Sequence, residues 1–337
     1  MRNNQIVWGF ALLALAAGLV CMSRASASAA DSFNVLHNFQ GKPADGAVPH
    51  YGSLILSGTN LYGMTFVGGA NNNGTIFEFN TKTGALTLLH SFEGGTTDGA
   101  NPNGSLILSG TNLYGMTFVG GANNTGTIFE FNTKTGALTL LHSFEGGTTD
   151  GDHPYGNLIL SGTTLYGMTS SGGANNNGTI FEFNTKTGQL TLLHSFWGDG
   201  AYPYGNLILS GTNLFGMTYR GGVNDEGLIF MINTQNLELT QLHSFEGGTT
   251  DGAHPSGSLI LSGANLYGMT ELGGADSQGT IFEFNTKTGQ LTLLHSFEGG
   301  TTDGANPLGN LILSGTTLYG MTEVGGTDGV GIIFSLK

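Results

Sequence analysis

The residues best suited to chemistry are carboxylates that recur in one short motif. Asp-Gly-x-x-Pro occurs six times along the chain. Calcium takes six to eight oxygen ligands, so a set of such carboxylates could bind it. An Asp-Gly turn with Pro opening a strand is the simpler explanation of the motif, because no EF-hand pattern is present. The sequence therefore favours the turn in all six copies, including Asp45 and Asp199, and keeps calcium as the alternative, with Asp98, Asp150, Asp251 and Asp303 as its candidate ligands.

Three histidines beside the motif prolines suggest a second kind of metal site. His50, His153 and His254 belong to alternate copies of the motif. Three converging imidazoles would suit zinc or another transition metal. His50 follows its proline whereas the other two precede theirs, which weakens the symmetry. The other six histidines recur in Leu-His dipeptides, and repetition in every copy indicates a hydrogen-bonded structural role.

An aromatic patch near residue 200 is the strongest single candidate for a binding site. The loop before it is three residues shorter than in other copies, and Asp225 and Glu226 follow it. Aromatic rings beside carboxylates suit neutral sugars or a cationic group. The alternative is that the rings only fill the space that the shorter loop leaves. The predicted ligand-binding residues are Trp197, Tyr202, Tyr204, Tyr219 and Arg220.

The elements that position these residues come from an internal repeat. Leu-His recurs with its His at 37, 90, 142, 194, 243 and 295, a spacing of 49 to 53 residues, which is typical of stacked or ring-shaped repeat folds. Each copy contains four short strand patterns, at residues 105–109, 113–117, 127–131 and 138–144 in the second. Glycine and asparagine turns separate them, and no segment has helical periodicity.

The two ends of the repeat region complement each other. The last copy stops after its third strand pattern at residues 331–335, while residues 33–39 carry the pattern of a fourth strand. A strand permuted in this way closes a propeller and removes its open edge. We therefore predict an all-β fold, a six-bladed β-propeller over residues 31–337 with four strands per blade, whose N-terminal strand completes the last blade.

Several blocks recur in a fixed order in this region. They are Gly-Thr-Ile-Phe-Glu-Phe-Asn-Thr-Lys-Thr-Gly, Leu-Leu-His-Ser-Phe and Asn-Leu-Tyr-Gly-Met-Thr. From about Phe33 to Leu336 the chain resembles the GloVer tandem repeat of secreted bacterial choice-of-anchor proteins, and more distantly kelch repeats. The resemblance implies a propeller fold and a bacterial secreted location, and implies no particular activity.

Residues 1–30 have the composition of a secretory signal peptide. Arg2 is followed by an apolar run over residues 6–22 and by overlapping Ala-x-Ala sites at residues 25–29. Cys21 is the only cysteine, so cleavage leaves a chain without disulfides or thiolate sites. We expect a secreted or periplasmic bacterial protein, monomeric and without a membrane span after cleavage.

Acidic residues gather in the loops whose sequences differ between copies. In a blade of antiparallel strands, the loops before the first strand and after the second share one face. These loops hold every acidic residue except Asp31, Glu78, Glu130, Glu182, Glu238 and Glu283. Removing residues 1–30 removes two arginines and no acid, which takes the net charge from −14 to −16. Nucleic acid is thereby excluded as a partner.

These patterns favour a secreted binding or scaffold module over an enzyme. Near-identical copies make a surface more readily than a unique catalytic set, and the acidic face suits a neutral glycan or a cationic ligand, with calcium as the one cofactor the pattern allows. The partner would be a carbohydrate or a cell-surface protein. The alternative is a polysaccharide lyase, a glycosidase or a metal-dependent lactonase. Its unrepeated candidates are Asp152, Glu271, Glu323, Arg220 and the three histidines of the alternate copies.

Overall fold

The computed structural model describes residues 34–49 and 52–337. The chain divides into two units, Met1–Leu36 and His37–Lys337, and every described strand belongs to the second. The predicted signal peptide and His50 lie outside the described residues. Among the described residues, no helix has the length and hydropathy needed to cross a bilayer.

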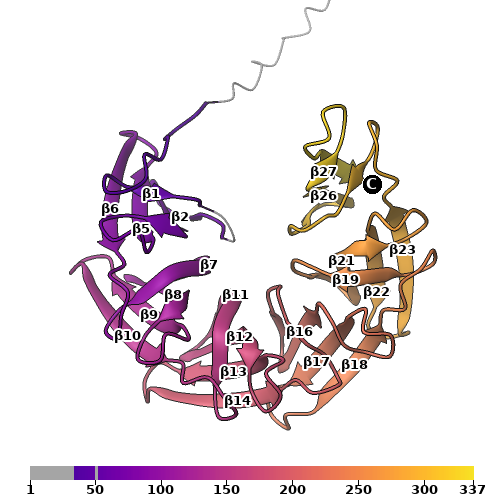
Figure 1. The fold of residues 1–337 in the computed structure, drawn as a ribbon, viewed down its shortest axis with the longest axis horizontal. Helices are drawn as coiled ribbons and strands as arrows, with labels where there is room; N and C mark the ends of the chain where they lie inside the picture. Colours follow the sequence, from indigo (N-terminus) through magenta and orange to yellow (C-terminus); the bar gives the residue numbers. More distant parts are fainter. Residues whose placement is uncertain (1–33, 50–51) are drawn as a thin grey trace, which may run out of the picture. The chain divides into compact units, whose positions relative to one another are not determined.

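Each repeat forms an antiparallel sheet from strands that follow one another in the chain (Figure 1), and repeats 1 and 6 each contain a separate two-stranded sheet as well. Two repeats have an uninterrupted first strand. Repeat 2 contains β7 (Gly99–Ser109), β8 (Asn112–Gly120), β9 (Thr127–Asn132) and β10 (Ala137–Ser143). Repeat 3 contains β11 (Gly151–Ser161), β12 (Thr164–Gly172), β13 (Thr179–Asn184) and β14 (Gln189–Ser195).

The other repeats have a shorter or divided first strand. Repeat 1 contains β1 (Gly46–Ala47), β2 (Ile55–Ser57), β3 (Asn60–Thr65), β4 (Val67–Gly68), β5 (Thr75–Asn80) and β6 (Ala85–Ser91). Repeat 4 contains β15 (Ile208–Ser210), β16 (Asn213–Thr218), β17 (Leu228–Asn233) and β18 (Leu239–Ser244). Repeat 5 contains β19 (Gly252–Pro255), β20 (Ile260–Ser262), β21 (Asn265–Gly273), β22 (Thr280–Asn285) and β23 (Gln290–Ser296). Repeat 6 contains β24 (Gly304–Ala305), β25 (Ile312–Ser314), β26 (Thr317–Met321), β27 (Val324–Gly325) and β28 (Ile333–Leu336).

The Asp-Gly-x-x-Pro motif is more ordered than its predicted loop. In repeat 2 its Gly99 pairs with Gly120, and Pro102 pairs with Thr117. The register then shifts between Asn103 and Ile107, so the strand accommodates the proline beside an irregularity. This pairing places the residues around each motif proline beside the residues that follow Met-Thr.

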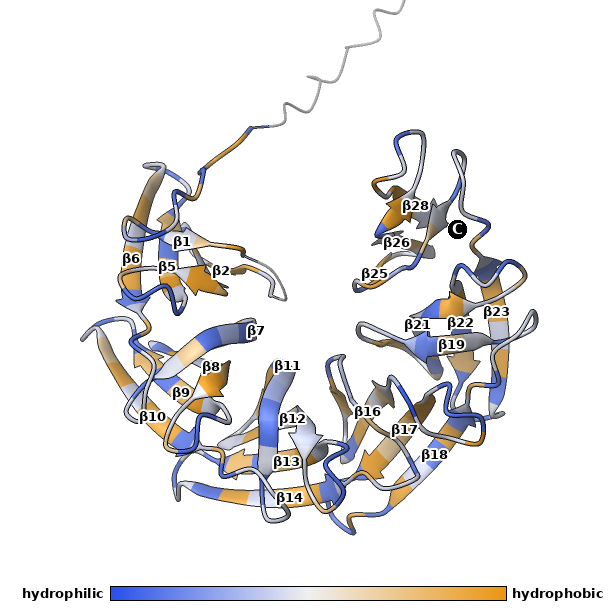
Figure 2. Ribbon diagram, in the orientation of Figure 1, coloured by the Kyte–Doolittle hydropathy of each residue, from blue (hydrophilic) through white to orange (hydrophobic). Residues whose placement is uncertain are grey.

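A bulge at the Leu-His dipeptide turns each histidine toward the motif. In repeat 2 the register of β9 and β10 shifts between Leu140 and His142, and the same shift recurs in repeats 1, 3, 4 and 5. A bulge re-aims the side chain that it carries. Elsewhere along outer strands such as β10 and β14, hydrophobic and hydrophilic residues alternate (Figure 2).

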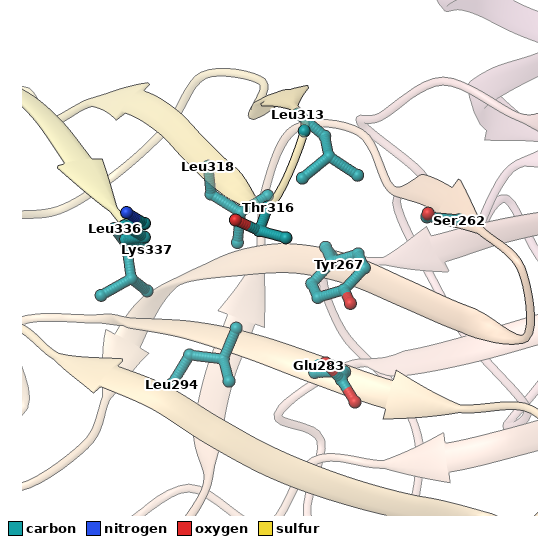
Figure 3. A pocket seen from close by; sticks show the side chains of 10 residues that line it. Ser262, Tyr267, Glu283, Leu294, Leu313, Thr316, Leu318, Leu336 and Lys337 are labelled. Carbon is teal, nitrogen blue, oxygen red and sulfur yellow. The ribbon is translucent and has the colours of Figure 1, made fainter.

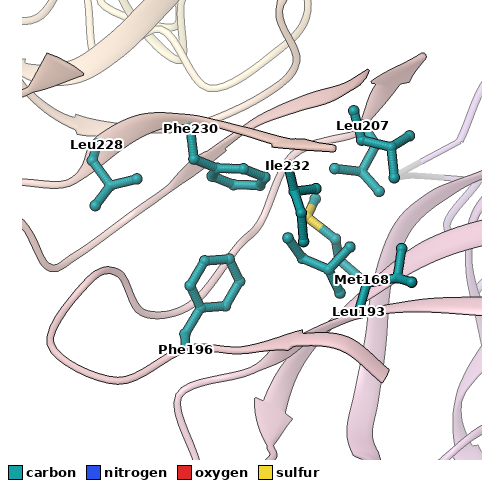
Figure 4. Close-up of a cluster of buried hydrophobic side chains, with 9 residues drawn as sticks. Met168, Leu193, Phe196, Leu207, Leu228, Phe230 and Ile232 are labelled. Carbon is teal, nitrogen blue, oxygen red and sulfur yellow. The ribbon is translucent and has the colours of Figure 1, made fainter. Parts of the chain in front are cut away.

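The hydrophobic core lies between consecutive sheets. One cluster joins Met168, Ile180 and Phe196 of repeat 3 to Leu207 and Phe230 of repeat 4 (Figure 4). The rings of Phe196 and Phe230 meet edge to face with centroids 5.5 Å apart. Each of the other four clusters likewise joins two successive repeats. Burying one such side chain contributes about 1.5–3 kcal/mol, so stability comes from stacking repeats on each other.

The predicted all-β, propeller-like repeat architecture is confirmed. The last sheet, β25-β26-β28, has three strands among the described residues, and residues 34–40 are not in a strand. The blade number and the closure by the N-terminal strand therefore stay predictions.

Candidate functional site

The strand pairing of repeat 4 brings its two variable segments together. Ala201 bridges Arg220, and the amide of Tyr219 donates to the carbonyl of Tyr202 over 3.1 Å. Tyr202 and His254, each just before a motif proline, have φ values of 55° and 53°. The residue before the motif proline has a φ between 52° and 57° in all six repeats, so this left-handed backbone belongs to the repeat and positions the variable side chain in each copy.

Five rings from three repeats form a continuous cluster. Tyr155 of repeat 3 lies 5.1 Å from Tyr204 of repeat 4, between ring centroids. Tyr204 lies 6.2 Å from Tyr202, nearly parallel to it, and 5.4 Å from Tyr219. Tyr219 in turn stacks on His254 of repeat 5, at 4.7 Å and an interplanar angle of 14°. All five residues are half-buried, so the cluster offers ring surface to solvent.

A glutamate contacts each half of the Tyr219–His254 stack. The Tyr219 hydroxyl donates to Glu271 Oε2 over 2.9 Å. His254 Nε2 lies 3.4 Å from Glu226 Oε2. Burial, followed by the hydrogen bond to Glu271 and the charge of Glu271, raises the pKa of Tyr219 to about 12. The phenol therefore stays protonated and donates at neutral pH.

Arg220 does not add a free positive charge to this cluster. Its Nη1 lies 3.0 Å from Asp225 Oδ2, and Asp225 Oδ1 also accepts from the amide of Gly221. Both side chains are largely exposed, so the ion pair adds little stability. It does neutralise the arginine beside the tyrosines.

Trp197 takes no part in the described contacts of the cluster. Its side chain is 72% exposed, and its backbone amide donates to Asp199 Oδ1 over 2.7 Å. Of the five predicted ligand-binding residues, the structure thus joins Tyr202, Tyr204 and Tyr219 directly and places Arg220 next to Tyr219.

The four aspartates that the sequence offered as possible calcium ligands each accept hydrogen bonds from other groups of the protein. In repeat 2, Asp98 Oδ2 lies 3.0 Å from His90 Nε2 and accepts from the amide of Glu93, while Oδ1 accepts from the amide of Gly99. The same three contacts recur at Asp150, Asp251 and Asp303. Burial raises the pKa of Asp98, but its donors outweigh that effect and leave the pKa below the ordinary value. These contacts connect each aspartate to a Leu-His histidine and to two backbone amides, and calcium binding by the aspartates stays a prediction.

Neither described histidine of the alternate copies has two further metal-ligating neighbours. His153 packs on Phe118 with ring centroids 4.5 Å apart, and its Nδ1 lies 2.8 Å from Asp152 Oδ1. That approach lacks the angle of a hydrogen bond. Over residues 34–49 and 52–337, no group of three His, Cys, Asp or Glu side chains could hold a metal ion.

Sequence reasoning did not join His254 and Glu271 to the tyrosines. The signal was nevertheless available, because one variable position precedes each motif proline and another follows each Met-Thr. In the structure the first position of one repeat contacts the second position of the repeat before it. Tyr219–His254 and Phe118–His153 are two such pairs, and Asn101 contacts Phe66 through a 3.0 Å hydrogen bond to its carbonyl.

Known structures align with the chain at low sequence identity. The extracellular domain of a one component system, BT4673, from B. thetaiotaomicron aligns with a TM-score of 0.53 and 14% identity, covering 84% of this chain and 32% of that one. A Bacteroides thetaiotaomicron protein of unknown function aligns at 0.48 and 15%, covering 88% and 71%. TolB from Acinetobacter baumannii aligns at 0.44 and 15%, covering 79% and 60%. The chain thus spans about a third of the BT4673 domain.

Sequence comparison identifies the family of the chain. No curated protein matches the chain. The Gloeobacter/Verrucomicrobia repeat matches it twice, over residues 25–212 and 198–337, and so covers nearly all of it. The chain belongs to the Gloeobacter/Verrucomicrobia repeat family.

Proposed function

We propose that this protein is an exported bacterial binding module whose acidic variable face recognises a neutral glycan or a cationic ligand. The observation that carries the proposal is the half-buried cluster of Tyr155, Tyr202, Tyr204, Tyr219 and His254. Aromatic faces with a few fixed polar groups are the usual means of holding sugars and cationic groups. Trp197, exposed in the loop that leads to Tyr202, is the further ring that we propose for a longer ligand.

The raised pKa of Tyr219 argues against its use as a general base. A tyrosine that acts as a general base, as a lyase mechanism would need, requires a lowered pKa. The pKa of Tyr219 is instead raised to about 12. Glu226 and Glu271 each contact a ring of the cluster through one oxygen, an arrangement that orients a surface. A glycosidase would need two carboxylates facing one bond.

Ligand titration of the mature protein tests the proposal. We expect Tyr204→Ala to remove binding to glycans found on an array, because Tyr204 contacts three other rings of the cluster. Lys186→Ala, at an exposed hairpin turn after β13, is the matched control and should leave binding unchanged. Turnover of any bound glycan, lost in Glu271→Gln, would favour the enzyme instead.

For the fold, we propose that the six repeats close into a six-bladed ring. Backbone amides form a series in which each repeat donates to the side chain at the equivalent position of the next. The links are Ser53 to Ser105 (2.7 Å), Ser105 to Asn157 (2.6 Å), Asn157 to Asn206 (2.6 Å), Asn206 to Ser258 (3.1 Å) and Ser258 to Asn310 (2.9 Å). Closure would add the sixth link, from the Asn310 amide to the Ser53 hydroxyl.

Exposed apolar positions in the first and last repeats support closure. Leu54 is 55% exposed, whereas its equivalent Leu106 is 4% exposed. Met321 and Ile333 are 57% and 82% exposed, and both equivalents in repeat 5 are 1% exposed. In the other repeats these positions meet in the cores between sheets, so the two exposed faces match each other as neighbouring blades do.

A recess of about 370 Å³ supports the predicted role of residues 33–39. It is lined by Tyr267, Leu294, Leu313, Leu318 and Leu336, between repeats 5 and 6 (Figure 3). At the corresponding place between repeats 1 and 2, the core includes Leu138 of the fourth strand β10. In the repeat pattern, Leu138 corresponds to Phe33, the first residue of the predicted closing strand.

Cysteine pairs test closure, because the mature chain has no cysteine of its own. We expect a disulfide in Ser53→Cys/Asn310→Cys, as in the adjacent pair Ser258→Cys/Asn310→Cys. Ser105→Cys/Asn310→Cys should stay reduced, because two thiols must approach closely to join. An intramolecular bond in the second pair without one in the first would overturn closure.

A further inference from the structure

The charges that border the aromatic cluster indicate more about its ligand. Arg220 is paired with Asp225 at 3.0 Å, so the two glutamates set the local charge. Glu226 and Glu271 contact rings that are stacked 4.7 Å apart, which places negative charge on either part of the stack. A negative rim of this kind attracts cations and repels anionic polymers.

The two glutamates also present hydrogen-bond acceptors. Each uses Oε2 in its described contact with Tyr219 or His254, which leaves Oε1 for a donor from a ligand. The Tyr219 hydroxyl is itself committed as a donor to Glu271. A matching ligand therefore supplies N–H or O–H donors and positive charge. A primary ammonium provides both, with three donors, whereas a quaternary ammonium has no donor.

The tyrosine rings also suit a ligand that carries an ammonium group. A ring face attracts a nearby ammonium by about 0.5–2 kcal/mol, depending on how far the group is desolvated. Tyr202 and Tyr204 lie nearly parallel, with an interplanar angle of 19°, and Tyr155 extends the aromatic surface into repeat 3. This surface is longer than one ammonium needs and suits the rings of a chain of sugars.

We propose that the ligand is a glycan that carries free primary amino groups, with Tyr155, Tyr202 and Tyr204 holding sugar rings and Glu226 and Glu271 holding an ammonium at the Tyr219–His254 stack. This inference rests on the proposed function, and it names the ligand class for the same site. His254 is a positioning residue, because it connects Glu226 to the ring of Tyr219.

Calorimetric titration with three oligosaccharides tests the inference. The probes are a glucosamine oligomer, its N-acetylated form and an oligogalacturonate, at about pH 6 so that the amines are protonated, and at about 20 and 300 mM salt. We expect the glucosamine oligomer to bind at least about tenfold more tightly than the N-acetylated form at low salt, with the difference shrinking at high salt. The oligogalacturonate should not bind.

Two variants separate the charge from the aromatic surface. Glu271→Gln retains an acceptor for the Tyr219 hydroxyl and should remove most of the preference for the amine without changing affinity for the N-acetylated form. Tyr204→Ala should weaken both, and Lys186→Ala neither. Equal binding of the two oligomers would refute the proposed preference for a free amino group, but it would not refute the proposal that the cluster binds a glycan. If no oligomer binds, and an array shows no other glycan bound, both proposals fail.

Discussion

The buried aspartate of repeat 2 provides a quantitative test of how the turns are held. Asp98 is nearly buried, with 8% of its side chain exposed, and accepts hydrogen bonds from the amides of Glu93 and Gly99 as well as contacting His90. In Asp98→Ala these two amides lose their acceptor. The hydrogen bond from Gly99 is buried, whereas the one from Glu93 is part-buried. An unsatisfied buried donor costs about 1–3 kcal/mol and a hydrogen bond nearer to solvent contributes about 0.5–1.5 kcal/mol, so the variant should lose about 1.5–4.5 kcal/mol of unfolding free energy.

Asp199 is the matched control within the same chain. It occupies the equivalent position of repeat 4 in the shorter loop, but 32% of its side chain is exposed. Water can replace its contacts, and Asp199→Ala should cost about 1 kcal/mol. Urea unfolding of both variants measures the difference. Equal losses would refute the argument that burial of the amides sets the cost.

The same pair of variants distinguishes hydrogen bonding from calcium binding. A cation that binds only the folded protein raises the melting temperature by mass action. On the hydrogen-bond account, the wild-type melting temperature is the same in EDTA and in millimolar calcium. A rise in calcium that Asp98→Ala abolishes would instead make these carboxylates ligands.

The pH dependence of the stability that Asp98 contributes follows from the direction of its pKa shift. The pKa of Asp98 is lower in the folded protein than its ordinary value, because its donors outweigh the effect of burial. A lowered folded pKa stabilises the protein above the unfolded pKa, near 3.9, and this stability is lost as pH falls through the folded pKa. The difference between wild type and Asp98→Asn should therefore be constant near neutral pH and shrink below about pH 4.

Three further outcomes check other parts of the structure. A methyl group on Gly104 would lie 2.0 Å from the carbonyl oxygen of Gly156, whereas on Gly110 it would meet nothing within 4 Å, and both have positive φ. Gly104→Ala should therefore unfold at lower urea than Gly110→Ala by about 1–3 kcal/mol, and equal midpoints would contradict this packing. Absorbance titration should show Tyr219 ionising at about 12, and stability should fall as pH rises from about 10 toward that value, because the unfolded phenol ionises first. Burial remains in Glu271→Gln, so the pKa of Tyr219 should fall in that variant without reaching its ordinary value, and a titration unchanged from wild type would contradict the contribution of Glu271. The mass of the exported protein should correspond to cleavage after residue 27 or 29, and an intact N-terminus would refute the signal peptide.

The repeated part of the fold was predictable because each repeat carries the same local signals. The alternation in Thr-Ile-Phe-Glu-Phe, as at residues 127–131, became β9 within one residue of its predicted end. In repeats 2 and 3 the first strand is longer than predicted. Gly99 to Pro102 form no alternating pattern, and their pairing depends on backbone partners in β8 rather than on side chains. Propensity could not indicate it, because Gly and Pro are depleted in strands.

The candidate site was only half predictable, because its contacts join loops that are distant in sequence. Unusual residues in one repeat identified the tyrosines, but nothing local connects Tyr219 to His254, 35 positions away, or to Glu271. The structure supplies the rule: residues at equivalent positions of neighbouring repeats touch. Ser53 and Ser105 do so at a separation of 52 residues, and Tyr219 and Glu271 do so at the same separation. The variable positions of such a repeat protein should therefore be compared from one repeat to the next, because a ligand meets them as neighbours.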